Sequence, residues 1–202
     1  GLTSINIPND VTSIGESAFY ECSGLSFLTI GNGVTSIGRD AFKECSNLTK
    51  VEINNNALIS KAYNSNPRIN DYFGSQVEEY LLGEEVKSIG EFAFSECPNL
   101  IKVHLSDGLT SIGESAFNWC SHLRQINIPS SVTSIGDGAF SNCRGLTSVH
   151  ITDIAAWCNI KFGDPNSNPL FFAHHIFVND EEVKDLIIPN FVISIGDNTF
   201  YG

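Results

Sequence analysis

A pattern of 23 residues that recurs along the chain constrains the fold more than any other feature. The clearest copy runs from Leu100 to His122, and the next copy begins at Leu123. The residues of buried type in this copy are Leu100, Val103, Leu105, Leu109, Ile112, Ala116, Phe117 and Cys120. A fixed period of about 20 to 50 residues is typical of solenoids, in which each repeat is one coil stacked on its neighbours.

The first position of the pattern occurs eight times. These positions are Leu2, Leu25, Leu48, Val77, Leu100, Leu123, Leu146 and Val183. Two coils are longer than the others and cover residues 48–76 and 146–182. We therefore predict that residues 1–202 form a single array. Because the chain starts inside the pattern and stops inside the eighth copy, we expect it to be a fragment of a longer array.

Each coil combines two kinds of local pattern. Segments such as 28–30 and 126–128 alternate between apolar and polar residues as a short strand does, and a Pro or Gly follows. A Ser-Ile-Gly triplet comes next, and then an acidic residue before Ala-Phe, which suits the first turn of a short helix. The predicted fold is an α/β repeat solenoid. It would be a stack of coils with short parallel strands on one face and short helical or irregular segments on the other.

The two long coils carry insertions. The first adds six residues between Asn54 and Gln76, and either Tyr72 or Phe73 should fill the position that Phe42 and Phe94 fill in other coils. The second adds fourteen residues between 153 and 182, within which 176–183 reads as a small hairpin turning at Asn179-Asp180. Insertions in repeat arrays often lie on the binding face.

Charge and hydropathy exclude some classes of partner. The chain has 23 acidic and 11 basic residues, a formal net charge of −12. Nucleic acids and anionic membrane surfaces attract basic proteins, so neither is an expected partner. No apolar run approaches the roughly 18 residues that cross a bilayer, so no membrane insertion is expected in this segment. The acidity is explained by solubility.

The residues that could carry chemistry do not form a catalytic or metal-binding pattern. Cys22, Cys45, Cys97, Cys120 and Cys143 share one repeat position, so we expect a ladder of free, buried thiols rather than disulfides. Cys158, beside Trp157, reads as a core residue. His104 and His150 share a strand position two coils apart and cannot share a metal ion. No catalytic residues, metal ligands or cofactors are predicted, and the protein is not expected to be an enzyme.

The repeat has the form (L/V)-x-x-(I/V)-x-(I/L)-(P/G)-x-x-V-x-S-I-G-x-x-A-F-x-x-C, seen at 2–22, 25–45, 77–97, 100–120 and 123–143. This string closely resembles the BspA-type leucine-rich repeat. The resemblance implies a curved, right-handed coil stack with its short parallel strands on the concave face and its helical or irregular segments on the convex face. It further implies a secreted or cell-surface protein of a host-associated bacterium or parasitic protist. It also implies adhesion to host matrix proteins such as fibronectin. The asparagine of the commoner leucine-rich repeat is missing, so no asparagine ladder is expected.

Outward-facing positions of the concave strands supply the candidate binding residues. They are Phe27, Thr29, Lys50, Glu52, Glu79, Leu81, Lys102, His104, Gln125, Asn127, His150 and Ile187. On the opposite side, Trp119 stands where other coils have Glu or Asn. The predicted function is an extracellular or cell-surface module that mediates adhesion to a protein or glycan ligand, such as host extracellular matrix or a cell. The alternative is a structural spacer with no ligand of its own.

Overall fold

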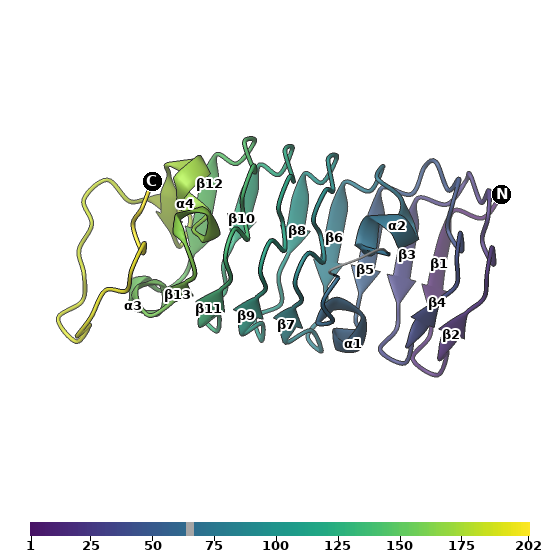
Figure 1. Ribbon diagram of the computed structural model, residues 1–202, viewed down its shortest axis with the longest axis horizontal. Helices are drawn as coiled ribbons and strands as arrows, with labels where there is room; N and C mark the ends of the chain where they lie inside the picture. Colours follow the sequence, from purple (N-terminus) through teal and green to yellow (C-terminus); the bar gives the residue numbers. More distant parts are fainter. Residues whose placement is uncertain (64–66) are drawn as a thin grey trace.

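The computed structural model describes residues 1–63 and 67–202, which form an elongated stack of coils (Figure 1). One strand of each coil contributes to a concave sheet. Its parallel strands are β1 (Ser4–Ile7), β3 (Phe27–Ile30), β5 (Lys50–Ile53), β6 (Glu79–Leu82) and β8 (Lys102–His104). After a break in the strand pairing beyond β8, the same row continues with β10 (Gln125–Asn127), β12 (Ser148–Ile151) and β14 (Ile176–Val178). The α/β repeat solenoid predicted from the periodicity is confirmed.

The Ser-Ile-Gly triplets form a second row of short parallel strands that the sequence did not predict. They are β2 (Ser13–Ile14), β4 (Ser36–Ile37), β7 (Ser88–Ile89), β9 (Ser111–Ile112) and β11 (Ser134–Ile135), followed by β13 (Lys161–Phe162). Close backbone approach explains the glycine. A Cβ atom on Gly113 would lie 2.7 Å from the amide nitrogen of Glu91, whereas nothing lies within 4 Å of that position on Gly15.

The Ala-Phe segments are turns, so the predicted helical turn is wrong for the regular coils. Two residues in each of these turns have a positive φ, for example Ser115 at 52° and Trp119 at 63°. This conformation prevents a helix and directs alternate N–H groups toward the next coil. The amides of residues 115, 117 and 119 donate to the carbonyls of residues 137, 139 and 141 at 2.8–2.9 Å. We call this surface, formed by residues 16–22 and their equivalents, the turn face.

The core is a column of aromatic side chains between the two faces. Adjacent rings of Phe94, Phe117 and Phe140 stack at centroid distances of 5.3 Å. Phe73 is fully buried against Phe42 at 5.5 Å, which confirms one of the two residues predicted for that position. Tyr80 of β6 also enters the column, 5.0 Å from Phe94. The column therefore continues through the longer coil without a gap.

The cysteine ladder packs against this column. All six cysteines are free, and Cys22 alone of the predicted ladder is only partly buried. The thiols of Cys120 and Cys143 donate to the carbonyls of Phe94 and Phe117, each at 3.1 Å. Burial raises the pKa of the Cys143 thiol. These cysteines are structural residues that link each coil to the one before it.

All helices belong to the two long coils. They are α1 (Asn56–Ile59), α2 (Ile69–Phe73), α3 (Ile154–Cys158) and α4 (Leu170–Ala173), with a 3-10 turn at Pro165–Ser167. The buried side chain of Asn55 caps α1, because its Oδ1 accepts a hydrogen bond from the N–H of Leu58. Its Nδ2 donates to the carbonyls of residues 31, 32 and 34 in the preceding coil. The side chains of Asn47 and Asn99 also donate hydrogen bonds to the preceding coil, to the carbonyl oxygens of Ser23 and Ser75 respectively. These isolated asparagines bridge coils at repeat positions other than the one that carries the asparagine of the commoner leucine-rich repeat.

The C-terminal coil differs from its prediction. The hairpin of residues 176–183 is confirmed, with β14 pairing antiparallel to β15 (Glu181–Glu182) across Asn179 and Asp180. However, β14 itself pairs in parallel with β12 and continues the concave sheet. Ile187 lies outside any strand and is 82% exposed, so its predicted place on the sheet is wrong. In Figure 1 the segment after β15 extends away from the stack.

Candidate binding face

Eleven of the twelve candidate residues lie on the concave sheet, and Ile187 is the exception. The register aligns Phe27, Lys50, Glu79 and Lys102 in one row across the strands. A second row contains Thr29, Glu52, Leu81 and His104. Gln125 faces Ser148, and Asn127 faces His150. The sheet thus presents two parallel rows of side chains, as the alternation within each strand predicts.

Three charged or titratable side chains at the centre of this face contact one another. Lys50 Nζ lies 3.0 Å from one oxygen of Glu79, and His104 Nε2 donates to the other oxygen at 2.6 Å. Partial burial raises the pKa of Glu79, but the hydrogen bonds and charges of Lys50 and His104 outweigh burial, so this pKa lies below its ordinary value. The carboxylate is therefore held charged and oriented across three neighbouring strands.

A second carboxylate is fixed beside this cluster. Glu52 accepts hydrogen bonds from Thr29 Oγ1 at 3.3 Å and Asn54 Nδ2 at 3.0 Å. Leu81 lies next to Glu52 in the register and remains partly exposed. Nearby Ile101 is 44% exposed. The centre of the face therefore combines oriented polar groups with accessible apolar surface, the mixture found in protein interfaces.

The C-terminal end of the face is shaped by the hairpin. The imidazole of His150 stacks on Phe177 with centroids 4.7 Å apart, and its Nδ1 lies 3.4 Å from Asp180. A groove of about 610 Å³ runs beside the hairpin and is lined by Asn127, His150 and the turn residues 179–180. Phe177 was missed as a face residue because residues 176–178 are all apolar and lack the alternation of apolar and polar residues seen in the other strands.

No catalytic or metal-binding arrangement was predicted. Within residues 1–63 and 67–202, no group of three or more His, Cys, Asp or Glu side chains could hold a metal ion. In the same part of the chain, no helix is long and apolar enough to cross a membrane.

Stacked coils with a parallel concave sheet define the class of the leucine-rich repeat solenoid, whose members use an extended concave surface for binding. The sequence identifies the family within that class. Residues 1–76 and 64–162 match the description "BspA type Leucine rich repeat region", with six copies. The chain belongs to the BspA-type leucine-rich repeat family. It matches no curated protein.

Solved structures share this fold at low sequence identity. A leucine-rich repeat protein of T. pallidum is 22% identical, with a TM-score of 0.52 over 79% of this chain and 72% of that chain. A leucine-rich repeat protein of Eubacterium ventriosum is 19% identical, with a TM-score of 0.40 over 99% of this chain and 64% of its own. A leucine rich cell surface protein of Faecalibacterium prausnitzii is 23% identical, with a TM-score of 0.36 over 79% of this chain and 62% of its own.

Proposed function

We propose that the protein is an extracellular or cell-surface adhesion module whose concave sheet binds a protein partner, such as a component of host matrix. The family supports a role in protein binding, and the resemblance of the repeat to surface proteins supports the location. The observation that carries the proposal is the cluster of Lys50, Glu79 and His104. Its side chains are already oriented by mutual contacts, so ordering them on binding costs little entropy.

The charge of the face also supports this role. The described strands β1 to β12 of the concave sheet contain two lysines, Lys50 and Lys102, and two glutamates, Glu52 and Glu79. The face is therefore balanced in formal charge, although the whole chain carries −12. A balanced face avoids the long-range repulsion that an acidic molecule exerts on acidic partners. Matrix proteins of either net charge could approach it.

The test is biolayer interferometry of the intact chain against purified matrix proteins and mucins at physiological salt. We expect saturable binding to at least one of them. A concave variant with Leu81→Ala, Lys102→Glu and His104→Ala should weaken that binding at least tenfold. A matched variant on the turn side of the coils, with Tyr20→Ala, Lys43→Glu and His122→Ala, changes the same kinds of residue and should leave the affinity unchanged.

Either of two results would count against the proposal. Equal affinity of the concave variant and the unmodified chain would move the binding site elsewhere. An absence of binding across the panel would favour the alternative, in which the coils are a structural spacer. Both variants should be compared by circular dichroism and thermal unfolding, so that a loss of binding is not confused with a loss of fold.

A further inference from the structure

Trp119 occupies an unusual place on the turn face. The equivalent residues in other regular coils are Glu21, Glu44, Glu96 and Asn142, with φ values of 56°, 61°, 58° and 60°. Trp119 has the same left-handed conformation, at 63°. Its amide donates to Ser141 O at 2.9 Å, so contact with the next coil fixes the backbone. A bulky aromatic residue is disfavoured at positive φ, where Asn and Gly are tolerated best.

Contacts inside the protein do not offset this disadvantage. The Trp119 side chain is 52% exposed, whereas Trp157 is 1% exposed and donates its indole N–H to Thr199 O. Within residues 1–63 and 67–202, Trp119 takes part in none of the aromatic or cation–π pairs that the structure contains. The array therefore holds a large aromatic side chain at a fixed position while much of its surface faces solvent.

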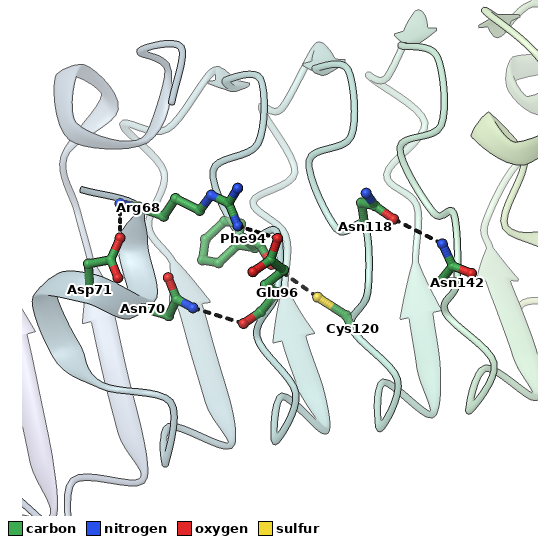
Figure 2. Close-up of polar contacts among 8 residues, drawn as sticks. All are labelled: Arg68, Asn70, Asp71, Phe94, Glu96, Asn118, Cys120 and Asn142. Atoms are coloured by element: carbon green, nitrogen blue, oxygen red, sulfur yellow. Dashed lines mark hydrogen bonds and ion pairs between the residues drawn. The ribbon is translucent and has the colours of Figure 1, made fainter. Parts of the chain in front are cut away.

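Planar polar side chains lie in the coils on both sides of this position. In the preceding coil, the carboxylate of Glu96 lies 2.7 Å from Arg68 Nη1. Toward the following coil, Asn142 Nδ2 donates to Asn118 Oδ1 at 3.3 Å. Figure 2 shows these two pairs on successive coils, in front of the concave strands. Each pair leaves further donors and acceptors free for a ligand, because an amide or a carboxylate can make several hydrogen bonds.

We propose that Trp119 is the platform of a carbohydrate-binding site on the turn face. The apolar face of a pyranose ring presents C–H groups with a partial positive charge, and the face of an indole carries negative charge density. The hydroxyl groups at the ring edge would meet the Glu96–Arg68 and Asn118–Asn142 pairs. This site is independent of the protein-binding function proposed for the concave sheet.

The surroundings favour a sugar over a protein partner. Protein hot spots lie in apolar, desolvated patches several residues wide. Among the described residues, the other strongly exposed large apolar side chains on this turn face are Tyr20 in the first coil and Tyr201 in the last, both several coils away from Trp119. The neighbours of Trp119 in its row are Glu96 and Asn142. One aromatic platform with a polar rim matches the two surfaces of a sugar ring.

Intrinsic fluorescence tests the proposal, because Trp119 is the exposed member of the two tryptophans. The probes are chitotriose, cellotriose, maltotriose, lactose and α-mannotriose at up to 20 mM, roughly the range where weak sugar sites saturate. We expect at least one probe to change the emission saturably and to protect the protein from acrylamide quenching. Trp119→Asn should weaken that binding at least tenfold by isothermal titration calorimetry.

The variants separate this proposal from the one for the concave sheet. Trp119→Asn installs the residue found at Asn142, so the backbone conformation is retained, and Trp119→Tyr should restore part of the binding. The concave variant described above should bind the sugar normally. A panel without any saturable response would overturn the proposal. A sugar that binds Trp119→Asn as well as it binds the unmodified chain would also overturn it. The same holds if Trp119→Asn weakens binding to a protein but to none of the sugars.

Discussion

At the scale of single residues, the concave face depends on how one carboxylate is held. Glu79 bonds Lys50 on one neighbouring strand and His104 on the other. Its side chain is 27% exposed, so water screens these contacts only in part. The same contacts that fix the binding surface therefore also link neighbouring coils, and the charge of Glu79 affects both binding and stability.

The lowered pKa of Glu79 gives a pH-dependent contribution to stability. A carboxyl whose pKa is depressed by folding stabilises the protein fully above its unfolded value, about 4.3, and loses this contribution as the pH falls through the folded value. We expect Glu79→Gln to lower the free energy of unfolding by about 0.5 kcal/mol at pH 7 and by progressively less as the pH falls below 4.

Urea unfolding of both proteins between pH 7 and pH 3 measures this difference. Glu78→Gln is the matched control, because Glu78 is the exposed neighbour outside the cluster. A difference for Glu79→Gln that stays constant with pH, or one that Glu78→Gln reproduces, would contradict the assignment of the contribution to the Glu79 contacts.

At the scale of elements, the regular coil owes its shape to contacts with its neighbours. The short strands β4, β7, β9 and β11 each pair in parallel with the equivalent short strand of a neighbouring coil. Their Ser-Ile-Gly triplets contain a glycine because the next backbone passes too close for a Cβ atom. The requirement for glycine is therefore a property of the stack rather than of the single coil.

This dependence predicts different effects for the same substitution in two coils. Gly113→Ala places a Cβ atom 2.7 Å from Glu91 N, and we expect a loss of about 1–3 kcal/mol in the free energy of unfolding. Gly15→Ala has nothing within 4 Å and should be neutral or slightly stabilising. Thermal and urea unfolding measure both. Equal losses at the two positions would show that backbone conformation, rather than close approach, requires the glycine.

The sequence predicted the concave strands better than the turns, for a physical reason. Alternation of buried and exposed residues is a local signal, so the rows containing Lys50 and His104 could be assigned in advance. The turns depend on hydrogen bonds between coils, and Ser115 and Trp119 give no local sign of a positive φ. Ile187 was misplaced because two apolar triplets, 176–178 and 186–188, fit the strand pattern, and the period alone cannot choose between them.

At the scale of the whole molecule, stability comes from repeated contacts between nearest neighbours. A regular coil pairs its strands and turn with the coils before and after it, and the aromatic column passes through all of them. Coils at 77–99, 100–122 and 123–145 have the same length, and the first two make the same three turn hydrogen bonds to the coil that follows. One coil can therefore replace another as a neighbour.

Removal of one complete coil tests this equivalence. Deletion of residues 100–122 joins two coils of the same pattern and should give a folded chain. Its urea m-value should fall by about a tenth, because 23 of 202 residues are lost and the m-value scales with the surface exposed on unfolding. Deletion of residues 100–111 alone removes a strand but leaves its turn, and this chain should not fold cooperatively. If the chain lacking residues 100–111 folded cooperatively and the chain lacking residues 100–122 did not, the nearest-neighbour description would be refuted.

The hydrogen bonds of the turn face all run in one sense. In the coils beginning at Leu2, Val77 and Leu100 the turn amides donate to the carbonyls of the following coil, as from Ser17 to Arg39 and from Trp119 to Ser141. The turn face is therefore chemically polar: its carbonyl oxygens point toward the N-terminal end and its N–H groups toward the C-terminal end. A second molecule could extend this ladder of the turn face only head to tail, because a head-to-head contact would oppose acceptor to acceptor or donor to donor.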